Sequence, residues 1–163
     1  MVVSLSAEHC RQFARSFAAG RQNGGMNTPA LLIATSAAVI FFLGFMHLVF
    51  TFHGSKFDPR DAELKARMMA VSPVISRQTT MWRAWVGFNA SHSYGAILFG
   101  AVWAYLALAH PAFLFQSVFL LALGLVVLLG YVVLARVYWF SIPFRGIGLA
   151  TVLYGLGLLV YLV

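Results

Sequence analysis

The sequence predicts an all-α polytopic membrane protein: a bundle of four transmembrane helices, with an interfacial amphipathic helix between the first and second spans. Hydrophobic residues fill 61% of the 163 positions and charged residues only 9%, whereas about 25% of the residues of a soluble domain are charged. The charges are also segregated, because positions 22–55 and 84–135 contain no Asp, Glu, Lys or Arg. These observations exclude a soluble domain, a disordered chain and a disulfide scaffold.

Four apolar segments are long enough to cross a membrane, since a hydrocarbon core of about 30 Å needs about 20 helical residues. We place the spans at residues 28–52, 80–109, 112–135 and 142–163. Thr28 and Pro29 suit the N-cap and first helical position of the first span. His110-Pro111 separates the second span from the third, because proline disfavours helical geometry in the preceding residue. The predicted organisation is an amphipathic tail at 1–27 followed by one transmembrane domain at 28–163.

The polar segment 53–79 carries most of the charge and predicts a helix lying on lipid headgroups. Asp58 is the expected N-cap and Pro59 the first helical residue. Two ion pairs at i,i+4 spacing and a short apolar stripe support the helix: Asp61–Lys65, Glu63–Arg67, and Leu64, Met68 and Val71.

Basic residues predict the orientation. Eight of them lie on the side that holds the loops after the first and third spans: Lys56, Arg60, Lys65, Arg67, Arg77, Arg83, Arg136 and Arg145. Only Arg11, Arg15 and Arg21 lie on the other side. Because cytoplasmic loops are enriched in Lys and Arg, we expect both termini on the side of the membrane opposite the cytoplasm. The net charge of +7 then points to anionic lipid rather than nucleic acid as the partner.

The polar residues inside the spans predict where a ligand binds. His47 lies five residues from the end of the first span and His92 eight residues after Ala84, about 7 and 12 Å below the same surface. Asn89 lies one turn before His92, among aromatic side chains. Ionisable residues within a membrane are functional candidates by default. The expected ligand-binding residues are His47, Trp85, Phe88, Asn89, His92 and Phe99.

Small residues predict how the helices pack. Ser36, Ile40, Gly44, His47 and Thr51 fall within one sector of about 80° on the first span and should face the bundle. On the second span, Gly87, Ser91 and Gly95 recur every four residues and are typical of a close helix contact. The histidines and Asn89 would then also have a purely structural explanation, as hydrogen bonds that hold the helices in register.

Several functions remain open. The first is the binding of an amphiphile, such as a quinone, pigment, sterol or lipid, beside His47, Asn89 and His92. The alternative is a b-type haem protein with His47 and His92 as axial ligands. A copper or zinc site with His53 as third ligand has less support, since no Cys or carboxylate accompanies the histidines within the spans.

An accessory role is also open, in which the chain is a subunit of a larger membrane complex or of a homo-oligomer. The sequence contains no nucleophile triad, paired carboxylates within the spans or phosphate-binding loop. Accessory or ligand-binding roles are therefore favoured over catalysis.

The string Trp82-x-x-Trp85-x-Gly87-Phe88-Asn89-x-Ser91-His92 resembles an uncharacterised family of small bacterial four-helix membrane proteins. The resemblance extends over most of Phe45 to Tyr161. It implies a four-helix fold and a bacterial origin. It implies no reaction, so the function has to come from the site.

Overall fold

The structure is a computed structural model that describes residues 27–163, and within them every regular element is a helix, without a strand. Four helices are long and apolar enough to cross a membrane: α2 (Thr28–Phe52), α4 (Met81–Ala109), α6 (Val118–Tyr138) and α7 (Ser141–Leu162). The described residues also form two short helices, α3 (Ala62–Ala70) and α5 (Pro111–Gln116). The prediction of four apolar spanning helices is confirmed. The predicted tail lies outside the described residues, except for Asn27.

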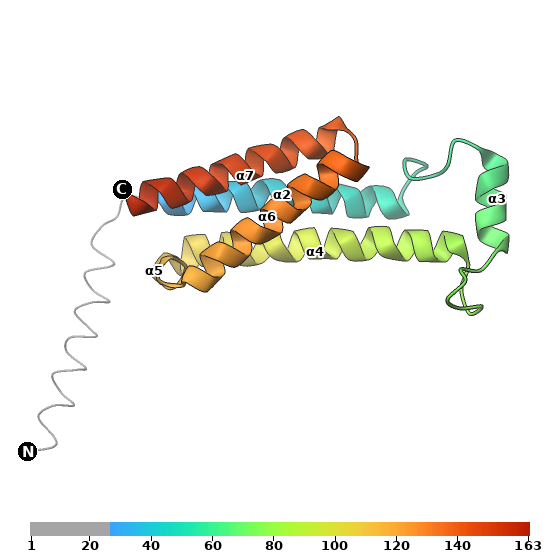
Figure 1. Ribbon diagram of the computed structural model, residues 1–163, viewed down its shortest axis with the longest axis horizontal. Coiled ribbons are helices and arrows are strands. Elements are labelled where there is room, and N and C mark those ends of the chain that lie inside the picture. Colours follow the sequence, from blue (N-terminus) through green and yellow to red (C-terminus); the bar gives the residue numbers. More distant parts are fainter. Residues whose placement is uncertain (1–26) are drawn as a thin grey trace, which may run out of the picture.

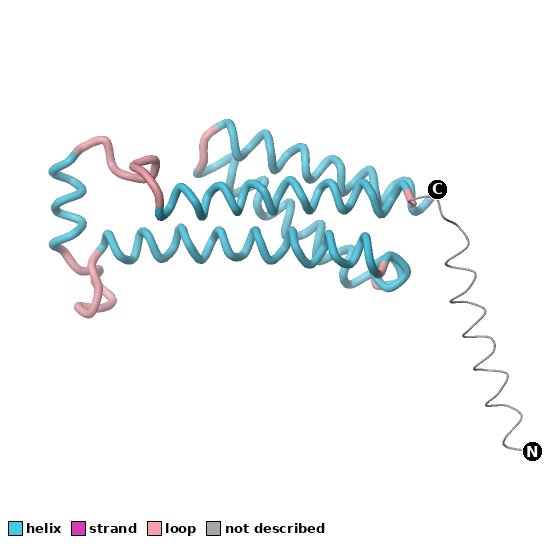
Figure 2. The backbone as a smooth tube through the Cα atoms, turned by 180° about the vertical axis from the view of Figure 1, so that it is seen from behind, coloured by secondary structure: helices cyan, strands magenta, loops and turns pink. Residues whose placement is uncertain are grey.

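Helix α2 is central, since it packs against both α4 and α7. Helix α6 packs against α7 and crosses the bundle at an incline (Figure 1). The connection that contains α3 and the turn between α6 and α7 lie at the same end of the bundle, which we call the α3 end (Figure 1). The loops on either side of α3 are the longest, and the other connections are short (Figure 2).

The contact between α2 and α4 depends on glycine. A Cβ atom on Gly44 would lie 2.7 Å from the Cβ of Ala96, and one on Gly100 would lie 2.6 Å from the carbonyl oxygen of Ala37. The two backbones therefore approach closely. The predicted contact through Gly87, Ser91 and Gly95 is wrong, because all three are exposed. Packing uses a different face of α4, which carries Ser93, Ala96 and Gly100.

The predicted inner face of α2 is confirmed for Ser36, Ile40 and Gly44, which are buried. The Ser36 hydroxyl donates a hydrogen bond of 2.7 Å to the carbonyl oxygen of Ala150 on α7. This bond satisfies a polar group that would otherwise be buried without a partner. It also fixes the position of α7 along α2.

The third span is not one continuous helix, contrary to the prediction of a helix over 112–135. Helix α5 ends at Gln116, and α6 begins at Val118 after Ser117. The Ser117 hydroxyl accepts a hydrogen bond of 3.2 Å from the Leu120 N–H, which caps α6. The apolar run hides this break, because a serine in such a run also fits a continuous helix. The break allows α6 to leave the direction of α5.

Helix α3 begins three residues later than predicted. Asp61 is its N-cap and accepts hydrogen bonds from the N–H groups of Glu63 and Leu64. Asp58 instead forms an ion pair of 2.7 Å with Lys65, so the predicted Asp61–Lys65 pair is wrong. The Glu63–Arg67 pair is confirmed at 2.7 Å. The N-cap of α2 is Asn27 rather than Thr28, so α2 begins one residue earlier than predicted.

A hydrogen-bonded aromatic pair connects α4, α6 and α7 at the end opposite α3. Trp103 Nε1 donates to the Tyr154 hydroxyl at 3.2 Å, and that hydroxyl donates to the Leu121 carbonyl oxygen at 3.0 Å. Tyr154 is fully buried, and Gly124 leaves the space that its ring occupies. This junction holds the start of α6 against the bundle.

Candidate functional site

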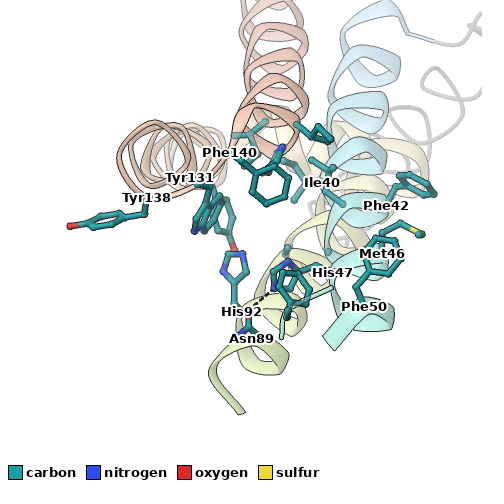
Figure 3. A pocket seen from close by; sticks show the side chains of 18 of the residues that line it. Ile40, Phe42, Met46, His47, Phe50, Asn89, His92, Tyr131, Tyr138 and Phe140 are labelled. Atoms are coloured by element: carbon teal, nitrogen blue, oxygen red, sulfur yellow. Dashed lines mark hydrogen bonds between the residues drawn. The ribbon is translucent and has the colours of Figure 1, made fainter. Parts of the chain in front are cut away.

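A cavity of about 520 Å³ lies among α2, α4, α6 and α7 toward the α3 end (Figure 3). Its walls are mainly aliphatic and aromatic, and they include Leu43, Met46, Phe50, Trp139, Phe140 and Ile147. No Asp, Glu, Lys or Arg is among its lining residues. The cavity is therefore apolar and uncharged, apart from a small polar cluster on one side.

The polar cluster begins with a hydrogen bond between α2 and α4. His47 Nε2 lies 3.0 Å from the Asn89 amide oxygen, and the Asn89 amide nitrogen donates to the Trp85 carbonyl oxygen at 2.9 Å (Figure 3). Because that second bond orients the amide, Asn89 presents its oxygen to His47. His47 Nε2 therefore donates, which leaves Nδ1 of the neutral ring as an acceptor.

His92 lies at the centre of an aromatic group. Its ring centroid is 5.3 Å from that of His47, 5.6 Å from that of Tyr131 and 4.8 Å from that of Trp139, each in an edge-on arrangement. The prediction that the two histidines lie together is confirmed. Within residues 27–163, neither His92 ring nitrogen has a hydrogen-bond partner, and neither is fully enclosed by protein, since no buried side-chain nitrogen or oxygen there lacks a partner.

Phe57 closes the cavity at the α3 end. Its ring centroid is 4.5 Å from that of His47, and its carbonyl oxygen accepts a hydrogen bond of 3.2 Å from Trp85 Nε1. The neighbouring Asp58 is tied to Lys65, whose ammonium lies 4.8 Å from the centre of the Trp82 ring. These contacts anchor the loop before α3 against α4. A smaller cavity of about 230 Å³ lies beyond Phe57 and is lined by Asp58 and Lys65.

Four of the six predicted ligand-binding residues line the larger cavity: His47, Trp85, Asn89 and His92. The other two do not line it. Phe88 is 75% exposed on the outer surface, and Phe99 is buried and stacked on Trp103 with ring centroids 4.6 Å apart. Both share a helical sector with His92. Along α4, Phe99 lies about two turns deeper than His92, and Phe88 lies about one turn nearer the surface. Each therefore has different neighbours from His92.

Tyr131 and Trp139 are cavity residues that the sequence analysis did not single out. Tyr131 lies five residues before Arg136, which would place it about 7 Å below the surface, a depth similar to that of His47. The depth count that paired the two histidines would therefore have found it. Trp139 resembles an interfacial aromatic anchor in sequence, and only its position beside His92 shows that it lines the cavity.

The predicted three-histidine copper or zinc site is not formed. Among the described residues, no three His, Cys, Asp or Glu side chains are close enough to hold a metal ion together. His53 lies at the C-cap of α2 and does not line the cavity.

Haem b with His47 and His92 as axial ligands stays a prediction, and the packing leaves it little room. Axial imidazoles bind iron from opposite faces of a porphyrin, so the macrocycle would lie between the two rings. One turn from the histidines, Gly44 and Ala96 bring α2 and α4 into contact. His47 Nε2 is also engaged by Asn89. Haem would require the two helices to separate.

Comparison of the chain with protein-family models, curated proteins and solved structures finds no match. The resemblance carried by the Trp82–His92 string therefore stays a prediction. The cavity and its polar cluster are the features from which a function can be argued.

Proposed function

We propose that this integral membrane protein binds an amphiphilic small molecule, of the kind represented by a quinone, pigment, sterol or lipid, in the cavity beside His47, Asn89 and His92. The observation that carries the proposal is an apolar cavity whose lining includes His92, Tyr131 and Trp139, three side chains whose polar atoms have no hydrogen-bond partner within residues 27–163. Small-molecule sites have this composition, with mainly hydrophobic walls and a few polar groups that orient the ligand. Their volumes run from about 300 to 1,000 Å³, and this cavity of about 520 Å³ lies within that range.

A structural role alone does not account for the whole polar cluster. The bond between His47 and Asn89 joins two helices and would fix their register. His92, the Tyr131 hydroxyl and Trp139 Nε1 make no hydrogen bond within the described residues, so they contribute no such link. Polar groups inside a membrane are costly unless they are paired. A bound headgroup would supply the missing partners.

We further propose that the site lies in the cytoplasmic half of a bacterial inner membrane. The α3 end carries the eight basic residues of the two loops, whose enrichment favours the cytoplasmic side. Both termini would then lie outside the cytoplasm. In this orientation α3, none of whose residues is buried, lies on the headgroups with its apolar stripe toward the lipid.

Two other assignments receive less support from the geometry. Haem requires the contact between α2 and α4 to open, as described above. An accessory subunit of a larger complex, or a homo-oligomer, would use the lipid-facing surface, where the exposed stripe of Gly87, Ser91 and Gly95 is available. Migration of native membrane extracts tests it: a species of about 18 to 40 kDa would count against a large assembly.

The proposal is tested by the amphiphiles that remain bound after gentle purification. Mass spectrometry of the extracted lipids would compare the wild type, the double variant His47→Ala/His92→Ala and the control His110→Ala. His110 is a matched control, because it lies at the opposite end of α4 and bonds to Tyr105. We expect an enriched amphiphile in the wild type and the control, and its loss from the double variant. The same profile in all three proteins would refute the proposal.

A further inference from the structure

We infer that the ligand of the cavity is a quinone or quinol, and this inference rests on the proposed function. Such a molecule has an uncharged planar ring that carries oxygen groups, and its apolar tail would be directed toward the lipid. The observation that supports this is an uncharged aromatic wall of the cavity, formed by His92, Tyr131 and Trp139, beside His47 with its acceptor nitrogen.

The absence of charge around the cavity narrows the ligand class. A fatty acid or an anionic phospholipid needs a cation near its headgroup, since an isolated charge in an apolar site is very costly. The lining contains no Lys or Arg, and Lys65 lies by the smaller cavity, where Asp58 neutralises it. The larger cavity therefore favours a neutral headgroup.

The hydrogen-bonding inventory favours several oxygen atoms over one. Trp139 Nε1 only donates, the Tyr131 hydroxyl donates or accepts, and neutral His92 has one donor and one acceptor nitrogen. His47 Nδ1 adds a further acceptor. A quinone offers two carbonyl oxygens to the donors, and a quinol offers two hydroxyl groups that also suit the acceptors. A sterol has one hydroxyl and would leave most of these groups unpartnered.

The shape of the site also suits a flat ring. The His92 ring stands edge-on to the rings of His47, Tyr131 and Trp139, at interplanar angles of 78°, 80° and 66°. These rings present both edges and faces to the cavity. A flat ligand ring could pair with them, because aromatic rings pair favourably in edge-to-face and offset arrangements. Figure 3 shows Tyr131 of α6 and His92 of α4 reaching toward each other on one side of the cavity.

The cavity also has an exit for the tail. Phe42 and Ile142 line it, yet they are 61% and 70% exposed on the surface of the bundle. The cavity thus reaches from the polar cluster to the lipid-facing surface. An isoprenoid or alkyl tail can leave in that direction while the ring stays beside His92.

The test uses the full chain, with native lipid removed, in a neutral detergent. A benzoquinone with a decyl tail, cholesterol, palmitate and phosphatidylglycerol are each added, and bound ligand is detected by native mass spectrometry. Quinone affinity is then measured from saturable quenching of tryptophan fluorescence. We expect saturable quinone binding that His92→Ala and Tyr131→Phe each weaken about threefold to tenfold, the loss expected for one hydrogen bond. His110→Ala should leave the affinity unchanged.

Tyr131→Phe keeps the ring and removes only the hydroxyl, so it separates a lost hydrogen bond from a collapsed cavity. Saturable binding of cholesterol, palmitate or phosphatidylglycerol without quinone binding would overturn this inference and leave the proposed function in place. Quinone quenching that is not saturable, or that both variants leave unchanged, would also overturn the inference. Binding of none of the four ligands, together with no copurifying amphiphile, would refute both proposals.

Discussion

His47 and Asn89 form the one side-chain hydrogen bond between α2 and α4 in the described part of the chain, with 3.0 Å between Nε2 and Oδ1. It lies one turn from the glycine contact at Gly44, where the same two helices approach closely against the small Ala96 side chain. The hydrogen bond and the close contact at Gly44 thus both hold α2 against α4. The bond also determines which His47 nitrogen is left as an acceptor.

Asn89→Ala should destabilise the protein by about 1 kcal/mol, because His47 loses its partner in a half-buried position. Ser91→Ala is the control on the same helix, since Ser91 is exposed and bonds only to the Phe88 carbonyl oxygen within its own helix. Unfolding in sodium dodecyl sulfate, followed by circular dichroism, measures the difference. Equal stability of the two variants would show that the bond adds nothing measurable.

Gly44→Val should disrupt the contact between α2 and α4, because its side chain would collide with Ala96 and with the backbone at Ile97. Overpacking of this kind costs about 1–3 kcal/mol. Gly87→Ala is the matched control on α4, since a Cβ at Gly87 meets nothing within 4 Å. The same denaturation assay compares them. A Gly44→Val protein as stable as Gly87→Ala would contradict the close approach.

Tyr154→Phe should cost about 1–3 kcal/mol, because Trp103 Nε1 and the Leu121 carbonyl oxygen both lose a partner in a buried region. Tyr161→Phe is the control, since Tyr161 is 44% exposed and its recorded contact is ring stacking on Phe115. Thermal unfolding, followed by circular dichroism, measures the difference. An unshifted midpoint in Tyr154→Phe would mean that the three-helix junction does not stabilise α6.

Single cysteines should label according to the proposed orientation. In a Cys10→Ser background, Ser72→Cys in the exposed loop should react with a membrane-impermeant maleimide only after the inner membrane is permeabilised. Val163→Cys, at the exposed C-terminal residue, should react in intact spheroplasts. The two positions control for each other, because the basic loops and the C-terminus are expected on opposite sides. The reverse pattern would invert the orientation.

Local signals in the chain were enough to predict the number of spans and part of the site. Hydropathy located the four long helices, and His110-Pro111 marked the boundary between α4 and α5. Counting residues from the ends of the spans placed His47 and His92 at similar depths, and the structure brings their rings to 5.3 Å. These features depend on composition and on the rise of a helix, both of which can be read from one segment at a time.

Which face of each helix meets a neighbour was decided only in the folded bundle. The stripe of Gly87, Ser91 and Gly95 has the spacing of a contact, yet Ser93, Ala96 and Gly100 form it, because they match the surface of α2 around Gly44. The break at Ser117 and the incline of α6 then bring Tyr131 and Trp139 to His92. Packing between helices depends on the fit of two surfaces, and a periodic pattern on one helix describes only one of them.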